Sequence, residues 1–263
     1  MCIFFCFMLY FISVLNSYTY LFFIWNGEII MNIPIIYEDP QILVCQKLPG
    51  IPVQSDKTLS PDLVNGLRNY CHQKNPNQEP YIGLVHRLDR PVGGVMVFGK
   101  TPYATKELNR QIQQGQVKKT YLCVVTKDLS SQIQKEPILL TDYLQKDAKN
   151  NCSKIVSANQ KNAKKAQLYY KVLAVKEGFS LIEVNLLTGR HHQIRVQMAA
   201  HVAGIYGDSK YNPSHNTNGD WKNIALFSNS LTFTHPKTKK ELCFTLSPTG
   251  DIWDRLLLFT PTV

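Results

Sequence analysis

The amino terminus limits what this chain can fold into more than any other segment. Its first 25 residues are all apolar or aromatic except Ser13, Asn16, Ser17 and Thr19, and they contain no Lys or Arg. A run of this length and apolarity is sufficient to cross a bilayer. A signal peptide would need basic residues before the apolar run and small residues at a cleavage site, and neither is present. A signal anchor would need flanking basic residues, and the nearest is Lys47.

Two interpretations of this segment remain open, a membrane segment and a translation start that truly lies at Met31. We favour a mis-assigned start or a disposable leader over residues 1–30, followed by one domain over residues 31–263. Residues 1–30 hold one acidic residue and no base, so the body carries a charge of +11, against +10 for the whole chain. Such a surplus predicts a polyanionic partner, either nucleic acid or a membrane surface.

The cysteine pattern excludes two common classes of small stabilised domain. No two of the seven cysteines form a CxxC pair, and the body holds an odd number. This spacing indicates neither a disulfide framework nor a zinc ribbon. Cys45 and Cys123 lie inside apolar runs, so we expect them to be core thiols. A reducing compartment, the cytoplasm, is therefore expected.

The sequence of residues 31–263 predicts a mixed α/β domain in which hairpins join some of the strands of the sheet. Strands are expected at 35–45 (two, around a turn), 95–98, 118–126, 166–176, 179–188 and 224–246 (two). Helices are expected over 61–72, between Thr101 and Gly115, and over 191–202. Residues 128–165 are polar and rich in lysine, and we favour a solvated surface excursion over an arm that contacts phosphate.

A dense group of ionisable side chains precedes a Gly-Gly turn. His86, Arg87, Asp89 and Arg90 occupy four of five consecutive positions between apolar runs. An aspartate between two arginines is expected to stay ionised, because opposite charges favour its charged form. Such a carboxylate suits a nucleophile or an electrostatic stabiliser better than a general acid. The alternative is a surface turn with local ion pairs.

A second polar stretch covers residues 188–198 and enters the last predicted helix. Arg190 and Arg195 are five residues apart, so we expect them on different helix faces. Ile194 and Met198 would face the sheet, because they share one side of the helix.

Two further features could carry chemistry, although each also has an ordinary structural explanation. The adjacent His191 and His192 suggest a metal site. Neighbouring side chains on a helix point about 100° apart, however, and no His or Glu follows either residue four positions later, so no metal is expected. Tyr121 follows two residues after Lys119 on a predicted strand. Taken alone, it is typical of a half-buried strand tyrosine.

Together these stretches resemble one enzyme family. The segment from His86 to Asp89, followed by Gly94, is similar to the HRLDxxTSG signature of RluA-type pseudouridine synthases. The family's KxY element corresponds to residues 119–121, its GRxHQIRVH element to residues 189–196 and its GDxxYG element to residues 207–211. Its opening YED…KPxGxPV element corresponds to residues 37–39 and 49–53. The resemblance covers residues 31 to about 246 and supports a start at Met31. It implies an α+β fold, with a mixed, largely antiparallel bent β-sheet flanked by helices. It also implies a single catalytic domain without an S4 domain.

The resemblance implies an RNA pseudouridine synthase, an isomerase that needs no cofactor and no metal. Asp89 would act as nucleophile towards the sugar or as base at C2′. Arg195 would hold Asp89 ionised and oriented, and Tyr121 would stack on the uracil and assist proton transfer at C5. Ile194 would line the base pocket. Arg87 would fill the gap that the flipped nucleotide leaves.

The remaining substrate contacts are carried over in the same way. Arg90 and Arg190 would contact phosphate, and His86 and Gln193 are assigned to substrate binding. We expect a monomer whose partner is structured RNA, ribosomal RNA in preference to transfer RNA, and no membrane association.

The chain departs from the family pattern at three places. Residues 91–93 are Pro-Val-Gly where the family has Asp-Thr-Ser, Gln197 replaces a histidine, and Asn212 replaces a glycine. The polar side chains that usually brace the catalytic loop in the family are therefore missing, and the rigidity of Pro91 is one way to hold the loop instead. A non-catalytic RNA-binding protein on the same fold is thus the main alternative. A membrane-anchored protein is the other, although the body shows no basic amphipathic helix.

Overall fold

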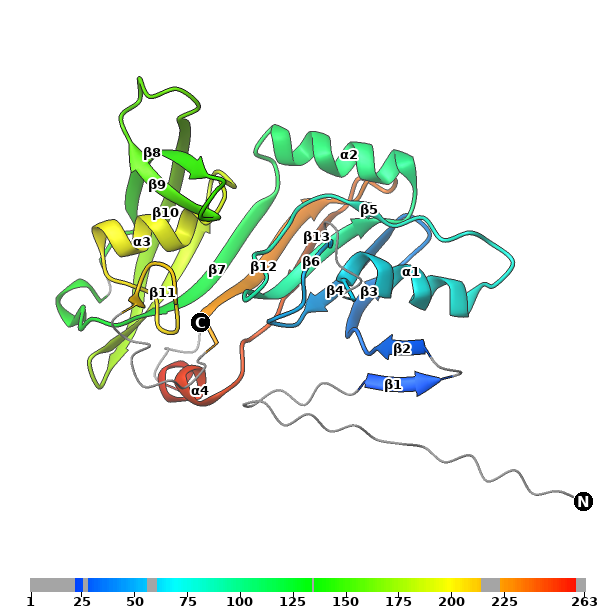
Figure 1. Ribbon diagram of the computed structural model, residues 1–263, viewed down its shortest axis with the longest axis horizontal. Helices are drawn as coiled ribbons and strands as arrows, with labels where there is room; N and C mark the ends of the chain where they lie inside the picture. Colours follow the sequence, from blue (N-terminus) through cyan, green and yellow to red (C-terminus); the bar gives the residue numbers. More distant parts are fainter. Residues whose placement is uncertain (1–21, 26–27, 56–60, 134, 214–222, 259–263) are drawn as a thin grey trace, which may run out of the picture.

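The computed structural model describes residues 22–25, 28–55, 61–133, 135–213 and 223–258 (Figure 1). The apolar segment 1–21, over which a leader or a membrane segment is expected, lies outside the described residues. A hairpin of β1 (Phe22–Trp25) and β2 (Glu28–Met31) follows it. Within the described ranges, no helix combines the length and apolarity needed to cross a bilayer.

One mixed sheet forms the centre of the molecule and contains eleven strands among the described residues. Its main path runs β3 (Ile35–Glu38), β4 (Ile42–Lys47), β6 (Gly93–Gly99), β12 (Leu226–Thr234), β7 (Lys118–Val125), β11 (Phe179–Leu186), β10 (Lys164–Lys176), β8 (Ile138–Asp147) and β9 (Cys152–Val156). The strand β5 (Gly83–Leu84) pairs with β6, and β13 (Glu241–Thr245) pairs with β12. Every described pair is antiparallel except β6 with β12, which confirms the largely antiparallel mixed sheet.

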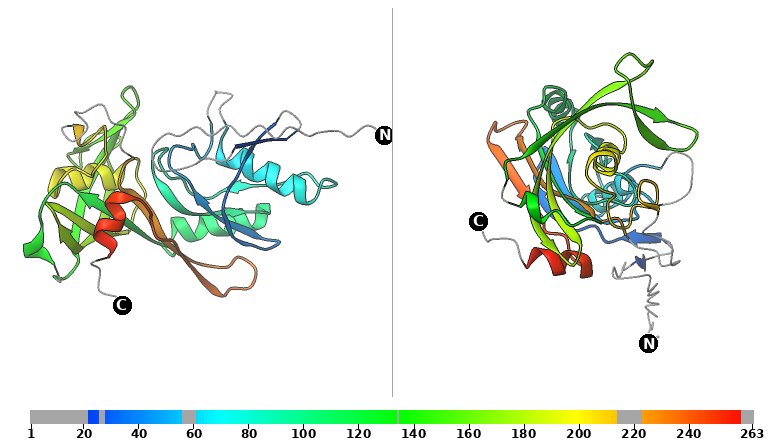
Figure 2. Two further views of the ribbon diagram at one scale, coloured as in Figure 1. Left: turned by 90° about the horizontal axis from the view of Figure 1, so that it is seen from below. Right: turned by 90° about the vertical axis from the view of Figure 1, so that its left-hand side faces the viewer.

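The sheet bends, and its two halves carry different helices (Figures 1 and 2). One half contains β3, β4 and β6 with α1 (Leu63–Lys74) and α2 (Pro102–Gln113). The other contains β8 to β11 with α3 (Gln193–His201) and α4 (Asp251–Leu257). The long strands β7 and β12 connect the halves, and a register shift in β12 between Ser228 and Ser230 adds local twist where they meet.

Local sequence signals explain most of these elements. Thr101 caps α2 by accepting a hydrogen bond from the Ala104 amide, and Gly115 follows the helix with a φ of +67°. The predicted hairpin of β10 and β11 is confirmed, with its turn at Glu177 and Gly178. Cys45 and Cys123 are fully buried, as expected of core thiols.

One prediction about local structure is wrong, and a second lacked the order that the structure shows. The third helix begins at Gln193 and not at 191, because His192 adopts a left-handed backbone with a φ of +54°. Residues 128–165 lie mostly at the surface, as expected, but they are ordered into the short helix η1 (Ser130–Gln132) and the strands β8 and β9. Leu144 and Ser153 on these two strands are buried. Below, residues 138–156, which form β8, β9 and their turn, are called the basic hairpin.

Gly94 allows the two halves of the sheet to meet closely. Its φ of +128° is a conformation that only glycine adopts easily, and a Cβ here would collide with the backbone of Ser228. Gly94 and Ser228 are direct partners in the parallel pair of β6 and β12. The glycine of the catalytic-loop motif is therefore required by strand packing.

Candidate active site

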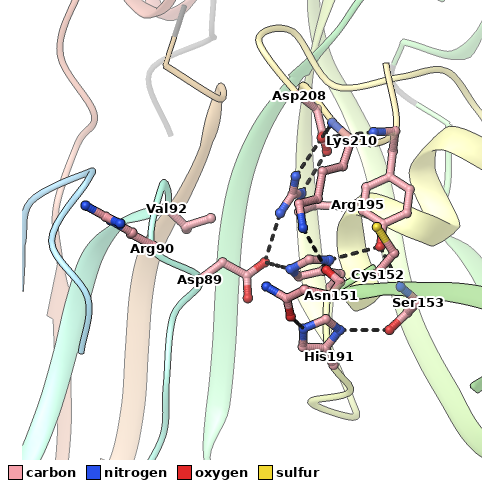
Figure 3. Close-up of polar contacts among 12 residues, drawn as sticks. Asp89, Arg90, Val92, Asn151, Cys152, Ser153, His191, Arg195, Asp208 and Lys210 are labelled. Carbon is pink, nitrogen blue, oxygen red and sulfur yellow. Dashed lines mark hydrogen bonds and ion pairs between the residues drawn. The ribbon is translucent and has the colours of Figure 1, made fainter. Parts of the chain in front are cut away.

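Three side chains from separate parts of the chain meet where the halves of the sheet join. Asp89 lies in the turn before β6, Tyr121 on β7 and Arg195 on α3. Figure 3 shows the Asp89 carboxylate directed at the Arg195 guanidinium, and 3.5 Å separates Asp89 Oδ2 from Arg195 Nη1. The Asp89 side chain is 28% exposed and that of Arg195 only 4%, so the carboxylate is the accessible member of the pair.

Arg195 is fixed from behind by a second carboxylate. Its Nε donates to Asp208 Oδ2 at 2.8 Å and its Nη2 donates to Oδ1 at 2.6 Å. Burial alone would lower the pKa of Arg195, but the hydrogen bonds and charge of Asp208 raise it. The hydrogen bonds and charge of Arg195 in turn lower the pKa of Asp208, although burial alone would raise it. Both groups are therefore ionised, and Arg195 presents its remaining Nη1 towards Asp89.

Tyr121 is buried on β7 opposite Ser228 of β12. Burial raises the pKa of its phenol, the nearby Asp89 carboxylate raises it further, and the Ser228 hydroxyl opposes both with a hydrogen bond. The phenol is thus neutral at physiological pH and keeps a proton that it can share with a bound base.

A row of polar groups lies beside Asp89 on the side of α3. His192 Nε2 is 3.6 Å from Asp89 Oδ2, and His192 Nδ1 is 2.9 Å from the hydroxyl of Tyr211. That hydroxyl accepts a hydrogen bond of 2.7 Å from the Ser153 amide on β9. His191 stacks on His192 with ring centroids 3.8 Å apart. The end of the basic hairpin therefore forms one wall of the site (Figure 3).

The turn that carries Asp89 is held by a buried lysine. Lys47 is fully buried, and its Nζ donates to the carbonyls of Leu48 (3.2 Å), Arg90 (2.9 Å) and Val92 (2.6 Å). Burial lowers its pKa to about 7, although the Asp89 charge opposes this. Besides Pro91, whose rigidity the sequence offered as a replacement for the missing polar side chains, Lys47 holds the turn through its main-chain carbonyls.

The two other departures from the family pattern are accommodated by new hydrogen bonds. Gln197 donates to Asp142 on β8 at 2.7 Å, which ties α3 to the basic hairpin. Asn212 donates to the Thr126 hydroxyl at 3.2 Å and to the Ile205 carbonyl at 3.1 Å. Both side chains are buried within the protein.

The predicted substrate residues divide into two groups. Arg87, Arg90 and Arg190 are exposed around the site, and the buried Ile194 precedes Arg195 on α3. Arg90 Nε donates to the Gly50 carbonyl at 2.9 Å, and Arg190 Nε donates to the Lys165 carbonyl at 2.9 Å. Both arginines keep further guanidinium donors that are not used in these bonds.

The other two predicted substrate residues are engaged inside the protein. His86 Nε2 accepts a hydrogen bond of 3.2 Å from the Val97 amide on β6. Gln193 is buried, and its amide bonds to Thr188, Gln167 and Gln197 and to the backbone N–H of Arg190. These contacts favour bracing of the fold over direct contact with a substrate.

The sequence reasoning missed four residues of the site: Lys47, His192, Asp208 and Tyr211. The last two lie in the recognised GDxxY segment, but their position beside Arg195 depends on tertiary structure. His192 was considered only as a metal ligand. No group of three His, Cys, Asp or Glu side chains in the described ranges is placed to hold a metal ion. A lone lysine at the end of the apolar strand 42–47 was the available signal for Lys47.

Comparisons with known proteins identify relatives of this chain. It is 32% identical over 210 residues to an "Uncharacterized RNA pseudouridine synthase YlyB" of Bacillus subtilis (79% of this chain). It is 31% identical over 242 residues (86% of this chain) to a "Ribosomal large subunit pseudouridine synthase D" of Neisseria meningitidis serogroup B. A "Ribosomal large subunit pseudouridine synthase C" of Escherichia coli K12 is 32% identical over 211 residues (78%). The chain spans 66%, 61% and 63% of the lengths of these three relatives.

The fold has solved counterparts. Human RNA Pseudouridylate Synthase Domain Containing 4 superposes with a TM-score of 0.66 at 20% identity, covering 81% of this chain and 87% of that one. Human RNA Pseudouridylate Synthase Domain Containing 1 gives 0.64 at 19% identity, covering 84% of each chain. The sequence profile of the family described as RNA pseudouridylate synthase matches residues 41–200, a range that contains Asp89, Tyr121 and Arg195. Because this match takes in more than half of the chain and all three converging side chains, the chain belongs to the RNA pseudouridylate synthase family.

Proposed function

We propose that this chain converts uridine to pseudouridine within structured RNA, with Asp89 as the nucleophile or base. The observation that supports this most directly is the convergence of Asp89, Tyr121 and Arg195. The carboxylate is accessible, 3.5 Å from a buried arginine, and close enough to the phenol to raise its pKa. Each of the three groups comes from a different element, so the arrangement depends on the whole fold.

The proposed reaction is an isomerisation in which atoms balance without a co-reactant. The bond between N1 and C1′ breaks, the uracil turns within its pocket, and C5 forms a new bond to C1′. The proton on C5 is released, and N1 gains one. An ionised carboxylate beside the sugar assists the first step in one of two ways. It bonds to C1′, and this bond breaks when C5 attacks C1′, or it removes a proton from C2′ and returns it as the bond between C5 and C1′ forms.

The surrounding residues support this chemistry. Arg195 orients Asp89 and is itself held by Asp208, so the pair is pre-formed before substrate arrives. Tyr121 carries a neutral phenol on which a uracil can stack and through which a proton near C5 can pass. Ile194 belongs to the same buried apolar core as Tyr121 and supplies an apolar surface for the base.

The target base must leave its stack to reach Asp89, because a carboxylate in a partly buried turn cannot approach a paired uridine. Arg87 is exposed two residues before Asp89 and fills the vacated position. Exposed cations contact the flanking phosphates, and they include Arg90, Arg190 and, on or beside the basic hairpin, Lys146, Lys149, Lys154, Lys164 and Lys165. Two of the three curated relatives are named for the ribosomal large subunit, and ribosomal RNA is therefore our first choice of substrate over transfer RNA.

Replacement of the carboxylate tests the assignment. We expect Asp89→Asn to abolish tritium release from [5-³H]uridine RNA, because a neutral amide can neither attack C1′ nor remove a proton. RNA binding should stay close to wild type in a filter-binding assay. Asp251→Asn, on the exposed face of α4, is the matched control and should retain full activity.

The non-catalytic alternative gives a different result. A wild-type chain that binds structured RNA but releases no tritium would support an RNA-binding protein, and the departures at Pro91, Val92 and Gly93 are the observation in its favour. An Asp89→Asn variant with full activity would overturn the catalytic role. Mapping of pseudouridine in cellular RNA, with and without the gene, would identify the target uridine.

A further inference from the structure

We propose that His192 and Tyr211 form a positioning pair that orients the Asp89 carboxylate through one uncharged N–H donor. This inference rests on the proposed function and adds a requirement to it. Arg195 supplies the charge opposite Asp89, whereas His192 would determine which carboxylate oxygen faces the substrate. Neither His192 nor Tyr211 has a role in the reaction as described so far.

The hydrogen bonds around Tyr211 determine which nitrogen of His192 carries the proton. The Tyr211 hydroxyl accepts the Ser153 amide proton at 2.7 Å, so its own proton is free to be donated elsewhere. The His192 Nδ1 atom lies 2.9 Å away and is the strongest acceptor nearby. The Cys152 thiol is a weak acceptor and donates to the Asn150 carbonyl at 3.3 Å. With Nδ1 accepting, the single proton of a neutral imidazole lies on Nε2, the nitrogen that faces Asp89.

The surroundings keep His192 neutral. Its side chain is 6% exposed. Burial lowers its pKa to about 3, and the charge of Arg195 adds to this effect. The titratable or charged groups that face the ring come from four segments: Asp89 of the catalytic turn, His191 and Arg195 beside or on α3, Asp208, Lys210 and Tyr211 of the following turn, and Cys152 of β9. A donor without charge can therefore approach Asp89 without competing with Arg195 for ion pairing.

The ring is also fixed in orientation. His192 adopts a φ of +54°, an unusual conformation for a residue other than glycine. Its ring stacks on His191, and His191 is held by the Ser153 hydroxyl at 2.9 Å and by Asn151 Oδ1 at 3.1 Å. Strained backbone of this kind persists only where the surroundings enforce it, and it is enriched at functional sites.

Both donors approach the same carboxylate oxygen. Arg195 Nη1 and His192 Nε2 lie 3.5 and 3.6 Å from Asp89 Oδ2, which leaves Oδ1 available to the substrate. These separations exceed an ordinary hydrogen bond, and contacts of this kind shorten when a substrate closes the site. Because Ser153 lies on β9, the same hydrogen bonds connect the basic hairpin to the catalytic carboxylate.

The test is Tyr211→Phe, which keeps the ring beside Arg195 and removes only the hydroxyl. Without that donor, His192 can move its proton to Nδ1 and turn a lone pair towards Asp89. We expect kcat for pseudouridine formation to fall about tenfold (~1.4 kcal/mol) with little change in KM for RNA. The pH–kcat profile should also change, because the N–H donor that faces Asp89 would be replaced by a lone pair. Tyr169→Phe on the exposed face of β10 is the matched control and should behave as wild type.

Two His192 variants separate positioning from simple packing. His192→Gln keeps an N–H donor near Nε2 and should retain more activity than His192→Leu at equal thermal stability. Adding Tyr211→Phe to His192→Gln should cause no further loss, because an amide has no alternative tautomer.

The outcomes distinguish the inference from the function on which it rests. If the wild type is active, Asp89→Asn is inactive and Tyr211→Phe keeps a wild-type kcat and pH profile, the positioning pair is refuted while the function stands. If the wild-type chain forms no pseudouridine, the proposed function itself fails.

Discussion

The buried pair of Asp208 and Arg195 gives the sharpest prediction about stability. The substitution Asp208→Asn keeps the size of the side chain and removes its charge. The Asp208 side chain is fully buried and that of Arg195 is 4% exposed, so water cannot replace the lost carboxylate. Asp208 also accepts the backbone N–H groups of Lys210 and Tyr211, which an amide oxygen can still do.

The expected magnitude follows from these contacts. Removal of one partner from a buried ion pair costs about 3–5 kcal/mol, because the other charge remains uncompensated. Asp89 lies 3.5 Å from the freed Arg195 and offsets part of that cost. We therefore expect the free energy of unfolding to fall by about 3 kcal/mol, the lower end of that range. Such a loss is large against the roughly 5–15 kcal/mol that stabilises a typical domain.

Urea unfolding of the full chain at pH 7, followed by circular dichroism, measures this loss. Asp251→Asn removes the partner of Arg255 in an exposed pair and should cost at most ~1 kcal/mol. In a double-mutant cycle, Asp208→Asn combined with Arg195→Met should cost less than the sum of the single variants. A loss below ~1 kcal/mol for Asp208→Asn would refute the argument, because it would mean that the pair is solvated or weakly coupled.

Three other perturbations have expected outcomes. Gly94→Ala should lower the melting temperature strongly, because a Cβ at this position meets the Ser228 backbone. Gly115→Ala should lower it less, because position 115 has a φ of +67° but open space around it. Lys47→Met should lower kcat strongly and the melting temperature to a smaller degree. It should also speed amide exchange over residues 89–93, because the carbonyls of Leu48, Arg90 and Val92 lose their donor. The pKa of His192 falls from 6.5 to about 3 on folding, so below pH 6.5 the unfolded chain binds a proton that the folded chain does not. The free energy of unfolding should therefore decline as the pH falls below 6.5. His192→Gln should flatten this decline, measured as the urea midpoint at each pH.

The elements predicted correctly are those whose signals are local. The cap at Thr101, the turn residue Gly115 and the Glu177–Gly178 turn specify their neighbours within a few residues, and the structure follows them. The pairing of strands is not local. Nothing in the sequence of β12 indicates that it lies between β6 and β7, more than a hundred residues earlier in the chain.

The same distinction applies to the site. Asp89, Tyr121 and Arg195 were found because their motifs lie at recognisable separations along the chain. Asp208 and Lys47 were missed because their importance depends on burial, and a charged residue is usually expected at the surface. His192 was assigned to a regular helix, whereas its left-handed backbone turns the ring towards Asp89.

The altered turn at residues 91–93 shows how the backbone can accommodate such departures from the family pattern. Pro91, Val92 and Gly93 offer no polar side chains to brace the turn. Lys47 instead binds the carbonyls of Arg90 and Val92, and the Val92 amide donates to the Asp89 carbonyl at 3.0 Å. Main-chain carbonyls are present whatever residue occupies a position, so a brace built on them tolerates substitution of the side chains. The backbone of the turn that carries Asp89 is therefore held by a lysine more than forty residues earlier in the chain.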